Sequence, residues 1–254
     1  MSSVSGSGER ILAILDLFTE ERPYWTTDEM RAALGYSRPT LYRYLRTLKE
    51  AGFLIALSPA AYSIGPRVTE MDYLMRRADP LIPAGQQHLR ALAAAFPGTA
   101  LLVRWYGAKL LCVASEVSDP AALSSYPRGR PMPLGKGAIS RAILAYLPRR
   151  EQDAILSAHG DEFAQDSGTV LATLRDVRRD GVAVAWGEVT RGVVGVAAPV
   201  LAADRAPVAA LCLTSRAEGM SEMRVRAIQD AVRGHAQDLS QAVQSKVMPV
   251  RRAS

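Results

Sequence analysis

Apolar residues near the start of the chain recur at the spacing of an amphipathic helix. Ile11, Ile14, Leu15 and Phe18 stand at positions i, i+3, i+4 and i+7, which places them on one face of a helix. The pattern predicts a first helix over residues 9–19. The residues before it are rich in serine and glycine and carry no such pattern, so a loose start is expected.

Two more short helices are predicted directly after the first. Thr26, followed three residues later by Glu29, has the form of a capping box. Gly35 supplies the left-handed residue that closes the helix begun there. Ser37 is placed to cap the next helix, over residues 37–50. Two helices joined by a tight glycine turn have the spacing of a helix-turn-helix.

The pattern then changes from helix to strand and back to helix. An apolar run at 53–57, a turn and a short alternation at 62–64 predict a β-hairpin, the wing of a winged helix-turn-helix. Residues 67–78 return to helical spacing and end before Pro80. A helix in this place is expected to link two domains.

Strands and helices are mingled in the remaining two thirds of the chain. The mixture predicts an α+β fold with an antiparallel sheet flanked by helices. Such a fold can hold a ligand between the sheet and its covering loops. Strands are expected at 99–105, 109–116, 181–186, 193–201 and 207–215, and helices at 80–96, 138–146, 148–156, 169–179 and 221–247.

These patterns together predict a domain organisation. No apolar run approaches the roughly 20 residues that cross a bilayer, and the start lacks the pattern of a signal peptide. We therefore expect a cytoplasmic protein with no membrane partner. The expected parts are a flexible start at 1–8, a winged helix-turn-helix DNA-binding domain at 9–66, a linker helix at 67–79, an effector-binding domain at 80–247 and a flexible tail at 248–254.

Charge singles out one of the predicted helices. The 254-residue chain has a net charge of +6, yet residues 1–78 are nearly neutral. Residues 36–49 hold four basic residues and no acidic one. Arginine at the start of a recognition helix can read guanine, whereas further basic side chains meet phosphates. The candidate DNA contacts are Ser37, Arg38, Thr40, Tyr42, Arg43, Arg46 and Lys49.

Two other classes of function are weighed against a DNA-binding role. An enzyme is the first, but His88, His159 and His235 are scattered along the sequence, and residues 129–137 depart from the spacing of a phosphate-binding loop. We therefore expect no metal site and no cofactor. A pure assembly module is the second, and it does not need the arginines of residues 37–50. The alternative interpretation of those arginines is a solvated helix face. The capped helix, the glycine turn, the helix that starts with proline and the hairpin around them favour DNA binding instead.

Three motifs in order resemble the IclR family of transcription regulators. Residues 10–65 contain RILAILDLF and SRPTLYRYLRTLKEAGFL, residues 133–147 read PLGKGAISRAILAYL, and residues 181–200 read GVAVAWGEVTRGVVGVAAPV. The resemblance covers about residues 9–246. It implies a GAF-like effector domain, a homodimer or tetramer, and ligand-controlled binding of double-stranded operator DNA. Many relatives control the catabolism of aromatic or small carboxylic acids, so an aromatic carboxylate is the expected effector.

The resemblance also indicates where the effector binds. The loop at 133–139 is expected to close over it, and N–H groups at the start of the 138–147 helix are expected to hold its carboxylate. Trp105 and Trp186 are candidates for the aromatic walls of the effector pocket. The chain has Gly135 and Gly137 where the family commonly has His and Thr. The candidate effector contacts are Trp105, Leu134, Gly135, Ala138, Ile139, Trp186, Glu188, Cys212 and Thr214.

Overall fold

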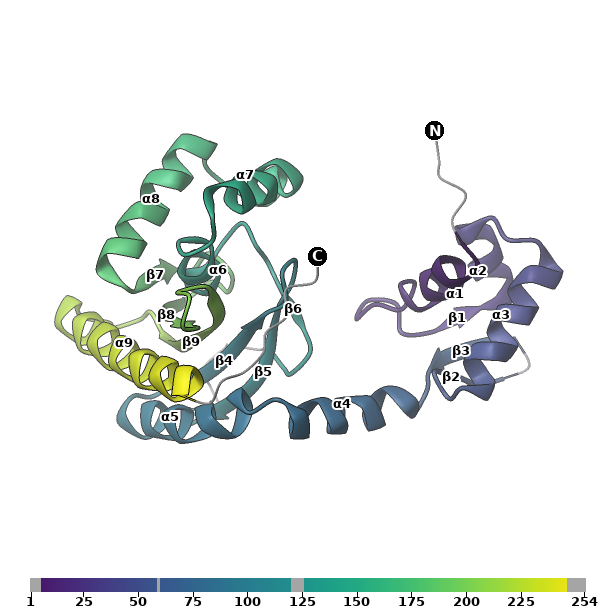
Figure 1. Ribbon diagram of the computed structural model, residues 1–254, viewed down its shortest axis with the longest axis horizontal. Coiled ribbons are helices and arrows are strands. Elements are labelled where there is room, and N and C mark those ends of the chain that lie inside the picture. The colour runs from purple at the N-terminus through teal and green to yellow at the C-terminus, as the bar shows by residue number, and fades with distance from the viewer. Residues whose placement is uncertain (1–5, 59, 120–125, 246–254) are drawn as a thin grey trace. The chain divides into compact units, whose positions relative to one another are not determined.

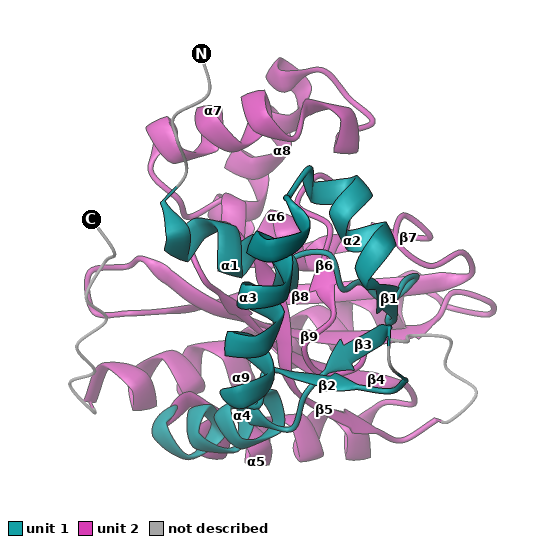
Figure 2. Cartoon of the chain, turned by 90° about the vertical axis from the view of Figure 1, so that its right-hand side faces the viewer, with its two compact units in different colours: residues 1–79 teal, residues 80–254 magenta. Residues whose placement is uncertain are grey.

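The chain divides into two compact units, residues 1–79 and residues 80–254 (Figure 2). The computed structural model describes residues 6–58, 60–119 and 126–245. Each unit has its own hydrophobic core. The two units are therefore described separately.

The first unit is a winged helix-turn-helix, as predicted from the sequence (Figure 1). A small antiparallel sheet with strand order β1-β3-β2 packs beside three helices, and a fourth helix follows. The elements are α1 (Ser7–Leu15), β1 (Trp25–Thr26), α2 (Thr27–Leu34), α3 (Arg38–Glu50), β2 (Leu54–Ala56), β3 (Ala61–Ile64) and α4 (Arg67–Ala78).

Local hydrogen bonds explain where these helices begin and end. The capping box is confirmed: the Glu29 N–H donates to Thr26 Oγ1, and the Thr26 N–H donates to Glu29 Oε2. α2 ends at Gly35, which has a φ of 66°. α1 ends earlier than predicted, because the Leu17 N–H bonds to the Ile14 carbonyl, three residues back, and no longer to one four residues back.

The second unit is built on a six-stranded antiparallel sheet with strand order β6-β5-β4-β9-β8-β7. The sheet and its flanking helices confirm the predicted α+β class. The strands are β4 (Thr99–Trp105), β5 (Leu110–Val117), β6 (Pro131–Met132), β7 (Ala183–Trp186), β8 (Val193–Leu201) and β9 (Pro207–Arg216). The helices are α5 (Leu81–Ala95), α6 (Ala138–Leu144), α7 (Arg149–Ala158), α8 (Ser167–Asp180) and α9 (Glu222–Ser245), with a 3-10 turn η1 (Gly160–Glu162).

The two faces of this sheet bury separate cores. Side chains alternate between the faces along each strand. Leu101 and Cys212 point to the side covered by α6 and α8, whereas Leu102 and Leu211 point to the side covered by α5 and α9. A ligand between the sheet and α6 is therefore separated from α5 and α9 by the sheet itself.

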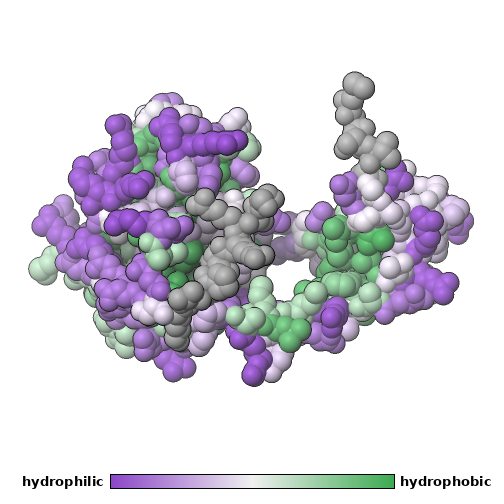
Figure 3. All heavy atoms as spheres, in the orientation of Figure 1, coloured by the Kyte–Doolittle hydropathy of each residue, from purple (hydrophilic) through white to green (hydrophobic). Residues whose placement is uncertain are grey.

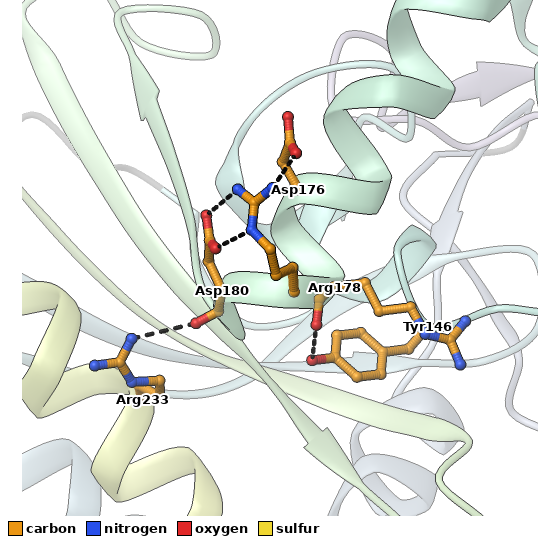
Figure 4. A network of polar contacts seen from close by, with 6 residues as sticks. Tyr146, Asp176, Arg178, Asp180 and Arg233 are labelled. Carbon is orange, nitrogen blue, oxygen red and sulfur yellow. Dashed lines mark hydrogen bonds and ion pairs between the residues drawn. The ribbon is translucent and has the colours of Figure 1, made fainter.

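A polar network joins the helices of the two sides beside the sheet (Figure 4). The Arg233 guanidinium, on α9, donates to the carbonyl of Asp180 at the end of α8. The Tyr146 hydroxyl donates to the carbonyl of Arg178. Arg179 pairs with the Asp180 carboxylate. The C-terminal end of α8 is thus held from both sides.

No helix in the described part of the chain is long and apolar enough to cross a membrane.

Candidate DNA-binding and effector sites

Helix α3 buries one face and exposes the other. Its apolar face consists of Leu41, Tyr44, Leu45 and Leu48, which are buried in the core of the first unit. The helix begins with Pro39 in its first turn, where a missing N–H removes no helical hydrogen bond. Its opposite face is left to solvent.

The predicted DNA contacts all lie on this helix or at its N-cap. The side chains of Arg38, Tyr42, Arg43, Arg46 and Lys49 are exposed. The Arg38 guanidinium lies 5.6 Å from the centre of the Tyr42 ring, and that of Arg43 lies 5.1 Å from the Tyr44 ring. The structure therefore presents arginine side chains and a tyrosine on one exposed surface.

Two small polar residues at the helix start bond to each other. Ser37 occupies the N-cap position, as predicted, but its hydroxyl makes no hydrogen bond to the helix backbone. It donates instead to Thr40 Oγ1 at 2.9 Å. Thr40 is half-buried. Any contact of these hydroxyls with a phosphate requires that this bond be shared or exchanged.

Arg46 is the one predicted DNA contact that forms an ion pair within α3. Its Nε donates to Glu50 Oε1 at 2.8 Å, one turn further along the helix. The hydrogen bond and the negative charge of Glu50 raise the pKa of Arg46. Glu50 directly follows residues 36–49, the segment without acidic residues. It therefore neutralises part of the basic charge of this helix.

The second unit contains a cavity between the sheet and the start of α6. It has a volume of about 60 Å³ and shares Lys136, Ser140 and Glu188 with a neighbouring cavity of about 290 Å³. A cavity that holds a benzene ring has about 150 Å³, so an aromatic occupant requires space from both cavities. Leu101, Ala185 and Val193 form part of its apolar wall. Five of the predicted effector contacts line it: Ala138, Ile139, Glu188, Cys212 and Thr214.

Glu188 places a carboxylate of the protein itself directly before α6. Its Oε2 accepts the Gly137 N–H at 2.9 Å, directly before α6. It also pairs with the Arg141 guanidinium at 2.8 Å. The Gly137 N–H is therefore already occupied by the protein's own carboxylate, whereas the expectation for the N–H groups at the start of the 138–147 helix stays a prediction.

Lys136 lies at the edge of the same cavity and has an exposed side chain. It makes no hydrogen bond or ion pair with any residue that the structure describes. Glu188 balances the charge of Arg141 but not that of Lys136. A free ammonium beside an apolar cavity favours an anionic occupant.

Cys212 belongs to the apolar floor of the cavity. Burial raises the pKa of its thiol to about 12, and burial likewise raises that of Cys112 to about 11. Both thiols are therefore protonated at neutral pH and are poor nucleophiles. The hydroxyl of Thr214 donates to the Thr99 carbonyl at 3.2 Å and retains its acceptor lone pairs.

Two family models match the chain. The model for the IclR helix-turn-helix domain matches residues 7–55. The model for the bacterial transcriptional regulator IclR C-terminal domain matches residues 79–241. The chain belongs to the IclR family. It is therefore a transcription regulator with a helix-turn-helix domain and an effector domain.

Individual relatives cover nearly the whole chain. The regulator KipR of Bacillus subtilis is 23% identical over 238 residues, which are 91% of this chain and 94% of KipR. A crystal structure from Silicibacter sp. TM1040, described as an IclR transcriptional regulator, superposes with a TM-score of 0.82 at 25% identity and covers 94% and 96% of the two chains. An IclR homolog from Microbacterium hydrocarbonoxydans complexed with 4-hydroxybenzoate has a TM-score of 0.76 at 16% identity, over 94% and 100%.

Four of the predicted effector contacts of this IclR-family chain do not line the cavity: Trp105, Leu134, Gly135 and Trp186. Trp186 ends the edge strand β7, is 49% exposed and alternates away from its neighbour Ala185, which does line the cavity. Trp105 lies four residues beyond the lining residue Leu101 on β4, roughly 13 Å along the strand. The sequence does not reveal the order of the strands or the extent of the cavity along them.

Leu134 and Gly135 are held away from this cavity by Glu162. Their N–H groups donate to Glu162 Oε2 at 2.9 and 3.2 Å, and the Ser140 hydroxyl donates to the Leu134 carbonyl. The side chain of Leu134 is buried in the core. Gly135 lines a neighbouring cavity of about 290 Å³, beside Arg141.

The two glycines that depart from the family pattern each have a structural reason. A Cβ on Gly135 would lie 2.4 Å from the backbone of Glu162. Gly137 has a φ of 92°, and a Cβ there would lie 2.7 Å from Val189. Larger residues at these positions require a different path for the loop.

Four lining residues with polar groups were missed in the sequence: Tyr126, Lys136, Ser140 and Thr190. Lys136 stands inside the Gly-Lys-Gly segment already quoted for the family resemblance, so its position was a usable signal. Tyr126 lies within the loop-like stretch at 118–137, which gave no signal. It is the aromatic residue that lines this cavity, whereas the two predicted tryptophans do not line it.

The structure also corrects the expectation that the histidines are scattered. His88 on α5 and His235 on α9 are distant in sequence, but their Nδ1 atoms lie 3.1 Å apart. His159 lies elsewhere and contacts Glu162 at 2.9 Å. Two of the three histidines thus form a pair.

Proposed function

We propose that this IclR-family regulator binds operator DNA through α3 and changes its affinity for that DNA when a small aromatic carboxylate occupies the cavity beside α6. The observation that carries the effector proposal is the ammonium of Lys136, which lines an apolar cavity and pairs with no residue in the described part of the chain. The target is a catabolic operon for an aromatic or small carboxylic acid.

The exposed face of α3 supports the DNA-binding part of the proposal. In a helix-turn-helix, the N-terminal part of the second helix contacts base edges in the major groove. Arg38, Tyr42 and Arg43 are exposed there, and an arginine can donate two hydrogen bonds to guanine. Arg46 and Lys49, further along, are placed for phosphates, which add affinity without sequence preference.

The composition of the cavity supports an aromatic acid. Apolar walls from Leu101, Met132 and Val193 favour a ring, and the Tyr126 side chain offers an aromatic surface. Lys136 offers the complementary charge for a carboxylate. The 4-hydroxybenzoate complex of the M. hydrocarbonoxydans homolog is an example of this ligand class on the same fold.

Calorimetry with a panel of substituted benzoates, their neutral amides and aliphatic dicarboxylates tests the effector. We expect binding by at least one benzoate and none by its amide. Lys136→Met is expected to weaken that binding roughly 10- to 100-fold, since a hydrogen bond to a charged group contributes about 1.5–3 kcal/mol. Lys109→Met, at an exposed lysine outside the cavity, is the matched control.

The result against the proposal is equally specific. Binding of a sugar or dicarboxylate without any benzoate contradicts the aromatic class. A benzoate that binds Lys136→Met as tightly as the unchanged protein contradicts the proposed role of this lysine.

An unburied apolar face on α4 supports a homodimer. Val68, Met71, Leu74 and Met75 are 41, 46, 56 and 42% exposed, and α4 has no buried residue. Figure 3 shows apolar side chains along this helix. Exposed apolar patches of this kind mark protein contacts. A dimer presents two copies of α3 to two half-sites, and a tetramer through the effector units is the further assembly that the family resemblance implies.

A catalytic role is not part of the proposal. Cys212 lines the cavity and carries a thiol, which could act as a nucleophile only in its deprotonated form. Burial raises the pKa of this thiol, so it is protonated at neutral pH. Glu188 is paired with Arg141. These groups are suited to binding and positioning, so we expect the bound acid to be released unchanged.

A further inference from the structure

A cluster of metal-binding side chains lies on the side of the sheet opposite the effector cavity. It comprises His88 from α5 and His235 and Asp238 from α9. The two helices pack against each other and against the same face of the sheet (Figure 1). None of these residues has a part in the DNA-binding or effector sites described above.

The spacing on α9 places its two ligands together. His235 and Asp238 are three residues apart, so they project from the same face of the helix. His88 reaches them from α5, and its side chain is buried, at 7% exposure. One ligand atom from each of the three residues lies within 4.8 Å of the others.

We propose that His88, His235 and Asp238 bind a divalent transition-metal ion of the zinc type, which connects α5 to α9.

The distance between the two imidazoles fits such an ion. The Nδ1 atoms are 3.1 Å apart. Two nitrogens bound to one tetrahedral zinc at about 2.0–2.1 Å are separated by about 3.3 Å, so the rings need only a small adjustment. Each lone pair then points to the metal rather than to the other ring.

The donor set selects the kind of ion. Two imidazoles and one carboxylate suit zinc and neighbouring first-row ions, whereas magnesium and calcium prefer oxygen donors alone. Three protein ligands leave a fourth position for water. Since Asp238 is exposed and His235 half-buried, this position is open to solvent.

The other ring nitrogen of the buried histidine has a polar neighbour. Gln87 Nε2 lies 3.4 Å from His88 Nε2. When His88 binds a metal through Nδ1, its Nε2 carries a hydrogen and needs an acceptor. A rotation of the Gln87 amide supplies its carbonyl oxygen, and metal-bound histidines commonly donate in this way.

Metal binding and the packing of α5 on α9 are coupled. The ligands come from two helices, so the complete site exists only when these helices are packed together. An ion that binds the folded form alone stabilises it by mass action. We therefore expect zinc to stabilise the second unit.

Calorimetric titration of the full-length, chelator-treated chain with zinc tests the site. We expect one zinc per chain, with His235→Gln and Asp238→Asn each weakening binding at least tenfold. His159→Gln, which changes the histidine outside the cluster, is expected to leave zinc binding unchanged. Asp238 is exposed and His235 is only half-buried, so both variants are expected to fold.

Thermal unfolding and cobalt spectroscopy provide independent readouts. Saturating zinc is expected to raise the unfolding temperature of the unchanged chain by roughly 5 °C, with no rise in His235→Gln or when magnesium replaces zinc. Cobalt is expected to show the visible absorption of a site with nitrogen ligands. A chain that binds no zinc holds only an imidazole–imidazole hydrogen bond, and zinc binding of equal strength in both variants means that the ion binds elsewhere. Either result overturns the proposal.

Discussion

Two charged side chains at the cavity differ in what surrounds them. Glu188 accepts a backbone N–H from Gly137 and pairs with Arg141, so its charge is already balanced. Lys136 has no such partner among the described residues. An anionic ligand gains little binding energy by competing with Glu188 for Arg141, and more by approaching the ammonium of Lys136. We therefore expect recognition of an acid at this site to depend on Lys136.

A third charge, on Glu162, holds the loop beside the cavity. Partial burial acts to raise its pKa, but the N–H groups of Gly135 and Leu134 and the His159 ring outweigh burial, so the pKa lies below the ordinary 4.5. The carboxylate therefore contributes stability above about pH 4.5, and this contribution is lost as the pH falls through the folded-state pKa.

Glu162→Gln tests this anchor. The substitution is expected to lower the free energy of unfolding by about 1–2 kcal/mol at pH 7, because it replaces a charged acceptor of two N–H groups. The difference from the unchanged protein is expected to shrink as the pH is lowered well below 4.5. Urea unfolding at several pH values measures it, and a pH-independent difference argues against a charge-based anchor.

At the scale of the element, the proposed function divides the basic residues of α3 between two roles. Arg43→Ala is expected to reduce operator affinity by about 1–3 kcal/mol and to relax the preference at one base pair. Lys49→Ala is expected to weaken specific and non-specific DNA alike and to lower the salt dependence by about one counterion. Binding isotherms over a salt series separate the two. Equal behaviour of both variants contradicts the assigned division.

The elements also show which features a sequence reveals. β4 and β8 have the bounds that their apolar runs predicted, because a buried strand carries its own pattern. The two-residue strands β1 and β6 were missed, since each exists only through pairing with a strand elsewhere in the chain.

The set of residues that line the cavity also depends on which strands pair across the chain. The sequence identified Cys212 and Thr214, which share a face of β9 two residues apart. It misplaced Trp186, because neither the edge position of β7 nor the face toward which this residue alternates follows from local pattern. The contact between His88 and His235 likewise depends on how α5 packs on α9.

At the scale of the whole molecule, the apolar face of α4 predicts an obligatory association. Leu74→Glu is expected to convert dimers to monomers without unfolding the chain, since Leu74 is 56% exposed in the single chain. Light scattering after size exclusion measures the mass. Met223→Glu, at a residue 79% exposed on α9, is the control and is expected to remain dimeric. A dimeric Leu74→Glu contradicts the assignment of this face.

Effector and operator binding are linked in both directions. If the acid changes the affinity for DNA by some factor, then DNA changes the affinity for the acid by the same factor. The size of the response is set by the difference in the acid's affinity for the DNA-competent and DNA-incompetent forms. The sign of the response, release or recruitment, is fixed by which form binds the acid more tightly.

Fluorescence anisotropy with labelled DNA from the region upstream of the protein's own coding sequence tests the central claim most directly. The unchanged chain is expected to bind this DNA far more tightly than unrelated DNA at physiological salt. An aromatic acid from the calorimetric panel is expected to change that affinity, and Lys136→Met is expected to keep the DNA affinity but lose the response. Equal affinity for both DNAs, or the same response in Lys136→Met, contradicts the account.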